Sequence, residues 1–148
     1  MTPQPASAVP TPPLLRRFVR FSLIGIVGFV VDASTLSLCV WALQLGPYEG
    51  RVVSYLVAAT TTWLLNRRFT FADAAHGWAP VQWSRFLAVN AIGGAVNYGT
   101  YAGLIATADL VASQPVLGVA AGSFAGLIFN FTGSRLLVFR PLRPAGTL

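Results

Sequence analysis

The sequence predicts an all-α membrane protein with four transmembrane helices, arranged as two helical hairpins that repeat in parallel. Hydrophobic residues make up 55% of the 148-residue chain and charged residues only 9%, whereas soluble domains usually carry about 25% charged residues. Long apolar stretches alternate with short segments rich in glycine and proline, and the two halves of the chain share one pattern. A chain of this length has room for about four spans of roughly 20 residues, but not for a separate soluble catalytic domain.

The first half of the chain begins with a tail and continues with two apolar stretches. Residues 1–13 contain five prolines and no charged side chain, so we expect a disordered tail. Residues 14–20 carry three arginines and precede the first span, at about 21–45, which is too long for the apolar region of a cleaved signal peptide. Glycine and proline indicate a turn at 46–50, and the second span follows at about 51–65.

The second half of the chain contains a matching pair of spans. A polar loop is expected over residues 72–84, before a third span at about 86–108. A turn over 109–115 separates this span from the fourth, at about 116–133. The sequence therefore predicts a membrane domain over residues 14–140 and a short cytoplasmic tail over 141–148.

The arginines predict the orientation of the chain in the membrane. All ten basic residues are arginines, nine of them on one side of the predicted spans, with Arg51 near the other side. The positive-inside rule therefore places both termini and the central loop in the cytoplasm. The net charge of +6 could indicate nucleic acid, but arginines that flank apolar stretches serve membrane orientation and anionic headgroups instead. We expect no nucleic-acid partner.

The two halves of the chain align with each other, which predicts an internal repeat of one helical hairpin. Because each repeat holds two spans, both halves enter the membrane in the same direction, and an axis along the membrane normal should relate them. The aligned pairs are 20–28 with 85–93, Asp32 with Asn97, 47–50 with 115–118, and 66–71 with 134–139.

The second helix of each predicted hairpin carries a small or weakly polar residue at every fourth position. Such ridges let helix backbones approach closely and hydrogen-bond across the contact, so we interpret them mainly as packing surfaces. Residues four apart do not stay on one line along a helix of about 3.6 residues per turn, so the ridge curves around the helix. Its polar inner end could therefore lie outside the contact between the helices and line a cleft for headgroups. The ridges are Gly50, Ser54, Ala58, Thr62 and Asn66 in the first half, and Gly118, Gly122, Gly126, Asn130 and Ser134 in the second.

Two charged residues fall inside the predicted spans, where charge is costly. Counted from Arg20 at the helical rise, Asp32 lies roughly 18 Å into a hydrocarbon core of about 30 Å. An aspartate there costs about 2.5–3.5 kcal/mol, so it needs a partner, a wet cavity or a proton. Arg51 lies at a depth that differs by only about 6 Å, within reach of its long side chain. We therefore predict an Asp32–Arg51 pair, either as a structural ion pair that fixes the helix register or as part of a functional site.

Four motifs occur in a fixed order along the chain. They are RFxxxGxxGxxxD in the first span, NRRFTF after the second, RFxxxNxxGxxxN in the third and NFxxSRLLVF after the fourth. Together they resemble the GtrA-like family of small four-helix membrane proteins, over about residues 16–140. The resemblance implies a role in cell-surface polysaccharide synthesis, in which a polyprenyl-phosphate-linked sugar moves from the inner to the outer leaflet of the plasma membrane. The sequence departs from the family at Thr62-Trp63, where an Asn-Phe pair is common, while Asn130-Phe131 keeps that pair.

This implied role assigns functions to the polar residues. Arginines and polar residues at the inner helix ends would form a basic ring that binds the phosphate headgroup. Polar residues deeper in the bilayer would contact the substrate along its path. The predicted headgroup site comprises Arg20, Asn66, Arg67, Arg68, Arg85, Asn130, Ser134 and Arg135, and the deeper set comprises Asp32, Arg51, Asn90 and Asn97.

The residues of the chain show no pattern typical of an enzyme. A Walker-type glycine loop, a metal-ligand cluster and a nucleophile–base pair are all missing from the sequence. We therefore expect no catalytic residue, no metal and no cofactor, and transport would follow the substrate gradient or another protein. Cys39 is the only cysteine and is expected to be a buried small hydrophobe, and His76 is expected to be an isolated surface residue.

Two other classes of function remain open. The chain could be a non-catalytic membrane anchor or accessory subunit that recruits a glycosyltransferase through its basic inner face and the central loop with His76, Trp78 and Trp83. The resemblance allows this, because the family also covers relatives of a small subunit of dolichol-phosphate-mannose synthase. The chain could also be a small proton-coupled exporter of cationic compounds, but an arginine beside the acid disfavours a cation site.

Four short spans leave little interior for a sugar-sized path, so we expect a homo-oligomer or a larger complex.

Overall fold

The computed structural model describes residues 12–74 and 77–140 of the chain. In this part of the chain every regular element is a helix, which confirms the all-α prediction. Most of the predicted tails, and His76, lie outside the described residues. The elements are the α-helices α1 (Leu14–Ser37), α2 (Pro47–Leu65), α3 (Ala79–Thr107), α4 (Asp109–Ser113) and α5 (Pro115–Gly133), and the π-helical turns η1 (Leu38–Ala42), η2 (Asn66–Thr70) and η3 (Ser134–Val138).

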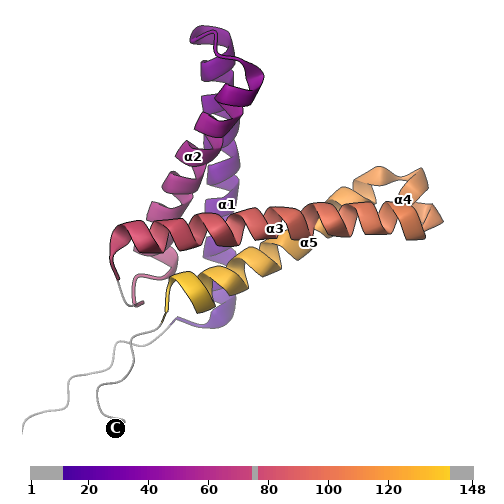
Figure 1. Ribbon diagram of the computed structural model, residues 1–148. Coiled ribbons are helices and arrows are strands. Elements are labelled where there is room, and N and C mark those ends of the chain that lie inside the picture. Colours follow the sequence, from indigo (N-terminus) through magenta and orange to yellow (C-terminus); the bar gives the residue numbers. More distant parts are fainter. Residues whose placement is uncertain (1–11, 75–76, 141–148) are drawn as a thin grey trace, which may run out of the picture.

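The helices form two hairpins that meet at one end and run in different directions (Figure 1). The first hairpin consists of α1 and α2, and the second of α3 and α5, with the short α4 in the turn between them. Each π-helical turn continues the helix before it, and η2 and η3 cover residues that the sequence aligns. The chain therefore folds as two helical hairpins, and their four passages through a membrane stay a prediction.

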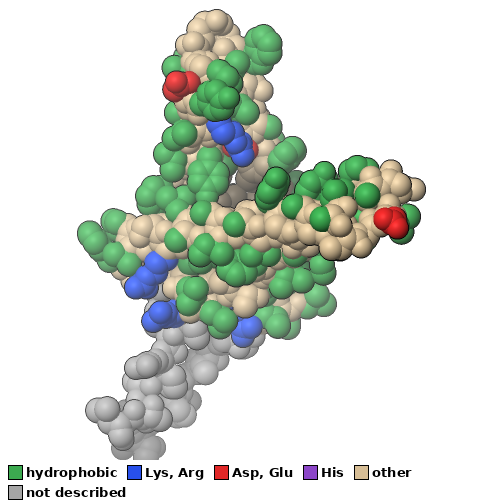
Figure 2. Space-filling model, turned by 45° about the vertical axis from the view of Figure 1, so that its right-hand side comes forward, with side chains coloured by type: hydrophobic (Ala, Val, Ile, Leu, Met, Phe, Trp, Pro, Cys, Tyr) green, Lys and Arg blue, Asp and Glu red, His purple; other side chains and the backbone are tan. Residues whose placement is uncertain are grey.

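The surface of both hairpins is largely apolar, as expected for a membrane protein. Two helical segments, Leu14–Ala42 and Pro115–Val138, are long and apolar enough to cross a membrane. Large apolar side chains point outward on both hairpins, and Phe29, Trp41 and Tyr98 are 72%, 79% and 70% exposed. Figure 2 shows such side chains spread over both hairpins. Soluble proteins rarely expose this much contiguous apolar surface, so lipid is the environment that suits it.

Helices begin within segments that the sequence predicted as turns or loops. The turn expected at 46–50 is helical from Pro47, and α3 begins within the loop expected over 72–84. The turn expected at 109–115 contains α4, and α5 begins at Pro115. Proline suits the first turn of a helix because the N–H that it lacks has no helical partner there, and because its fixed φ matches the helix. These prolines therefore begin helices rather than mark loops.

Within each hairpin, the predicted ridges pack against the partner helix. In the first hairpin Gly28 lies against the Thr62 side chain, and in the second the aligned Gly93 lies against the Asn130 side chain. Close approach of this kind is what small residues permit, so the structure confirms the interpretation of the ridges as packing surfaces. The buried ridge residues are Gly50, Ser54, Ala58 and Asn66 in the first half, and Gly118, Gly122, Gly126 and Ser134 in the second.

A methyl group at Gly122 should weaken the second hairpin. A Cβ atom there would lie 2.5 Å from the backbone oxygen of Asn97 and 2.8 Å from its Oδ1. Because a backbone atom cannot rotate away as a side chain can, the two helices would have to move apart. We expect Gly122→Ala to lower the free energy of unfolding by about 1–3 kcal/mol. Gly99→Ala is the matched control, because a Cβ at Gly99 meets nothing within 4 Å. Thermal unfolding in detergent measures both variants, and equal losses would contradict the close packing of α3 on α5.

The two hairpins meet in a cluster of buried, mostly aromatic side chains, which we call the aromatic junction. Phe71 and Phe139, which the sequence aligns, stack with ring centroids 4.7 Å apart and an angle of 10° between their planes. Each also contacts a phenylalanine of its own half edge-on, Phe21 at 6.3 Å and Phe86 at 6.2 Å. The halves are thus joined through aligned residues that make matching contacts. The junction comprises Phe21, Trp63, Phe71, Ala74, Phe86, Val89, Phe131, Val138 and Phe139.

Candidate functional site

A pocket of about 320 Å³ lies between the two hairpins, beside the aromatic junction. The first hairpin lines one side and residues of α3 and α5 line the other. Its wall is mainly apolar and includes Phe21 and Phe86 of the junction. We call this cavity the inter-hairpin pocket. Its polar lining residues are Asp32, Arg51, Tyr55, Thr62, Asn66, Asn90 and Asn130.

Asp32 and Arg51 form an ion pair at the inter-hairpin pocket, which confirms the predicted pairing. A guanidinium N–H of Arg51 donates to Oδ2 of Asp32. The side chain of Asp32 is 21% exposed and that of Arg51 is 55% exposed, so the guanidinium keeps donors for a further partner. The other carboxylate oxygen, Oδ1, is buried and has no hydrogen-bond partner among the described residues. Arg51 therefore has exposed donors for a ligand, and Asp32 has a buried acceptor without a partner.

Three asparagines bring further hydrogen-bonding groups to the pocket. Asn66 is 2% exposed, and its Oδ1 has no partner in the described part of the chain. The Oδ1 of Asn130 lies against Gly93, in the contact between α3 and α5, and also lacks a hydrogen bond there. Asn90 donates its Nδ2 to the backbone oxygen of Phe86 at 2.9 Å. Of the three, Asn66 combines the deepest burial with an unpartnered oxygen.

Among the uncharged residues of the predicted site, two lie away from this pocket. Asn97, which aligns with Asp32, packs inside the second hairpin against Gly122. Ser134, which aligns with Asn66, is completely buried, and its Oγ has no partner among the described residues. Its neighbours thus cover the short serine side chain entirely, and its predicted place in the inner rim of a headgroup site stays a prediction.

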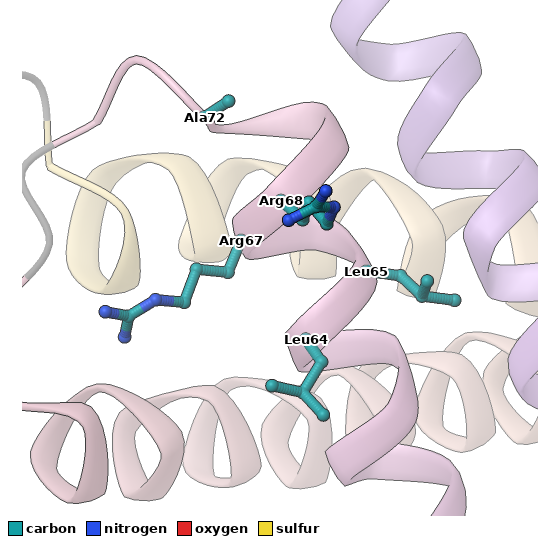
Figure 3. A pocket seen from close by; sticks show the side chains of 5 residues that line it. All are labelled: Leu64, Leu65, Arg67, Arg68 and Ala72. Atoms are coloured by element: carbon teal, nitrogen blue, oxygen red, sulfur yellow. The ribbon is translucent and has the colours of Figure 1, made fainter.

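Arg67 and Arg68 are adjacent on η2 and line one pocket, but their side chains have different surroundings. The guanidinium of Arg67 donates to Oε1 of Gln82 at 2.7 Å and lies 5.5 Å from the centre of the Trp63 ring. Figure 3 shows the two arginine side chains pointing in different directions around a second pocket, of about 520 Å³, whose other lining residues are apolar. Arg67 is thus engaged in a contact between the hairpins, whereas Arg68 is exposed.

The remaining arginines of the predicted ring lie at separate places. Arg20 donates to the backbone oxygen of Phe69 at 3.0 Å. Arg85 lines a third pocket, of about 240 Å³, together with Arg140. Arg85 and Arg135 are exposed and form no hydrogen bond or ion pair with other residues of the described ranges. Figure 2 shows several basic side chains near the end where the hairpins meet. The predicted ring residues therefore lie at separate places near a basic end of the molecule, and their role in binding a headgroup stays a prediction.

The sequence interpretation missed the polar residues that connect the hairpins. Gln82 is 4% exposed, accepts from Arg67 and donates its Nε2 to the backbone oxygen of Val138 at 3.4 Å. Trp83 donates its Nε1 to Oγ1 of Thr60 at 3.0 Å. Both residues were assigned to a loop. The proline at the start of α3 was the signal that could have placed them on a helix.

The chain is similar to known membrane proteins over most of its length. The family profile described as GtrA/DPMS, transmembrane domain, matches residues 20–144. A bactoprenol-linked glucose translocase of Salmonella phage P22 is 22% identical over 138 residues, which cover 88% of this chain and 100% of the relative. Proteins of the same name from Shigella phages SfII and SfV are each 20% identical over 127 residues, which cover 86% of this chain and 98% of each relative.

Proposed function

The chain belongs to the GtrA/DPMS transmembrane domain family, as its motifs predicted, and we propose that it translocates a polyprenyl-phosphate-linked sugar across the plasma membrane. The relatives named bactoprenol-linked glucose translocase support this function, because the similarity spans nearly the whole of each protein. In this proposal the chain crosses the membrane four times with both termini in the cytoplasm. It moves its substrate without changing it chemically, so it is not an enzyme.

The observation that carries the proposal is a pocket with polar and charged side chains in its wall, between two hairpins whose outer surfaces are apolar. Ionisable groups inside a membrane are costly and mark pathways for substrates or ions. A lipid-linked sugar meets the same difficulty, because its hydroxyl groups lose their hydrogen bonds to water on entering hydrocarbon. A polar path between the hairpins replaces those hydrogen bonds while the polyprenyl chain stays in the surrounding lipid. The Asp32–Arg51 pair and the asparagines supply such a path.

The exposed arginines at the junction end suit the phosphate of the substrate. Arg68, Arg85 and Arg135 are exposed, and arginine binds phosphate through charge-assisted hydrogen bonds that are often bidentate. Clusters of arginine at the cytoplasmic face also attract anionic headgroups. In the proposed cycle these residues collect the lipid from the inner leaflet. Arg67 has a different role, because its hydrogen bond to Gln82 ties the first hairpin to the second. A glycosyltransferase partner and a homo-oligomer belong to the same proposal.

A reconstituted translocation assay tests this function. Purified protein in vesicles is expected to bring a fluorescent polyprenyl-phosphate hexose within reach of a membrane-impermeant quencher. Vesicles that hold an unrelated helical membrane protein at the same density are the control, because they account for leaks that any inserted helix causes. The expected result is a faster loss of fluorescence with the protein than with the control.

Equal rates in the two kinds of vesicle would contradict translocation. Co-purification with a glycosyltransferase, together with such equal rates, would favour the accessory-subunit function. Trp78, which is 74% exposed, would provide an aromatic contact for that partner. Resistance of cells to cationic compounds on overexpression would favour the exporter instead.

A further inference from the structure

We propose that the inter-hairpin pocket is the sugar subsite of this protein, where Asp32 and Asn66 hydrogen-bond the hydroxyl groups of the lipid-linked sugar while its phosphate stays outside. The inference rests on the proposed function and assigns one part of the substrate to one cavity. Four observations support it: unpartnered polar atoms, the charge of the lining, the size of the cavity, and the asymmetry between the two halves.

The first observation is that two side chains at the pocket each carry a buried oxygen without a hydrogen-bond partner among the described residues. Asn66 is 2% exposed, and neither its Oδ1 nor the Oδ1 of Asp32 has a hydrogen-bond partner in the described ranges. Native proteins seldom leave buried polar groups unpaired, and such a group is explained when a ligand completes it. A hydroxyl group both donates and accepts, so it can pair with a carboxylate oxygen and with either end of an asparagine amide. A polyhydroxyl ligand therefore fits both side chains.

The second observation is that the lining carries no net charge. Asp32 and Arg51 are the only charged residues among those lining the pocket, and they pair with each other. A phosphate inside would meet the carboxylate of Asp32 without a surplus cation to balance it, and like charges at short range repel. Arg67 and Arg68 follow Asn66 directly in the chain, yet they line a different pocket. The geometry thus separates a neutral polar cavity from the arginines that suit a phosphate.

The third observation concerns size and shape. A cavity of about 320 Å³ lies at the lower end of the roughly 300–1,000 Å³ that small-molecule pockets occupy. Such pockets usually combine apolar and aromatic walls with a few polar groups that fix orientation. Here Phe29 and Tyr55 contribute aromatic surface, against which the C–H faces of a sugar ring can pack. The cavity suits one sugar-sized head, with the polyprenyl chain outside.

The fourth observation is that aligned residues of the two halves differ in whether they line the pocket. Asn66 lines it, whereas the aligned Ser134 does not, although both are buried and both carry an unpartnered oxygen. The two residues also begin the matching turns η2 and η3. Ser134→Ala therefore removes a buried polar group from an equivalent place in the fold without touching the pocket, which makes it a matched control for Asn66→Ala.

The test compares the binding of two lipids to the full chain in detergent. One is a polyprenyl-phosphate hexose, and the other is polyprenyl ethyl phosphate, a diester of the same charge without a sugar. The wild type should bind the sugar lipid more tightly. Asn66→Ala should weaken that binding roughly five- to tenfold, the effect of losing one hydrogen bond, and should leave binding of the ethyl ester unchanged. Ser134→Ala should leave the affinity for both lipids near the wild-type value.

Three results would overturn the proposal: equal wild-type affinity for the two lipids, equal weakening of both by Asn66→Ala, or equal effects of Asn66→Ala and Ser134→Ala. If Asn66→Ala does not fold, Asn90→Ala takes its place, because Asn90 lines the same pocket from α3 and is only half-buried. The translocation assay runs alongside. Sugar-dependent binding without translocation would refute the proposed function alone, and translocation without sugar-dependent binding would refute the subsite alone.

Discussion

Replacing Phe139 with alanine is expected to lower the free energy of unfolding by about 3–5 kcal/mol. The side chain is 2% exposed, stacks on Phe71 and contacts Phe86 edge-on. Truncation removes these ring contacts and leaves a cavity that the neighbouring rings fill only in part. Because the aromatic junction is where the hairpins meet, the loss should let the hairpins separate before their helices unwind.

Circular dichroism during thermal unfolding in detergent can measure this effect. The near-UV signal reports aromatic packing and the far-UV signal reports helix content, so the near-UV signal should be lost first. Phe124→Ala is the matched control, because Phe124 belongs to the same hairpin but is 61% exposed. We expect little change in the free energy of unfolding for the control. A similar loss in both variants would show that the junction does not hold the hairpins together.

The substitution Asp32→Asn should slow translocation of the lipid-linked sugar by about 10- to 100-fold. Hydrogen bonds to charged groups contribute about 1.5–3 kcal/mol, which corresponds to this range of rates. The change removes the carboxylate that pairs with Arg51 and weakens the free acceptor at the pocket. It also leaves Arg51 without its carboxylate partner, and in the proposed membrane arrangement an unpaired charge is costly.

The double variant Asp32→Asn with Arg51→Gln separates a structural role of the ion pair from a functional one. With both charges removed, no unpaired charge stays behind, so the double variant should unfold near the wild-type temperature. If the pair only fixes the helix register, transport should recover together with stability. We expect transport to stay low, because the carboxylate also contacts the substrate. Recovered transport at recovered stability would assign the pair a structural role alone.

Several features of the fold and the site could be predicted because they depend on helix geometry. The two ridges predicted close helix contacts, and Thr62 makes one with Gly28 and Asn130 one with Gly93, since residues four apart share a helix face. The pairing of Asp32 with Arg51 followed from depth, since the helical rise converts separation along the chain into distance across a membrane. Both predictions needed only the period and rise of a helix.

Other features could not be predicted, because they depend on neighbours from distant segments. The direction of Arg67 is set by Gln82 and Trp63, and Gln82 had been placed in a loop. Ser134 is fully buried because of the residues that pack around it. Its place in the ridge indicated only a small polar residue and could not predict this burial. A basic ring was a reasonable inference from spacing, but the direction of each side chain was not available from spacing alone.

The sequence by itself determined that this protein is an all-helical membrane protein of the GtrA type with close helix packing inside each hairpin, because composition, motifs and periodicity act within each half. Only the tertiary structure decided how the hairpins meet and which residues of the two halves line the pocket. The halves carry nearly the same pattern, so the pattern cannot indicate that Asn66 lines the pocket while Ser134 does not. That choice is made by the stacking of Phe71 on Phe139 and the other contacts of the aromatic junction, which join residues far apart in the chain.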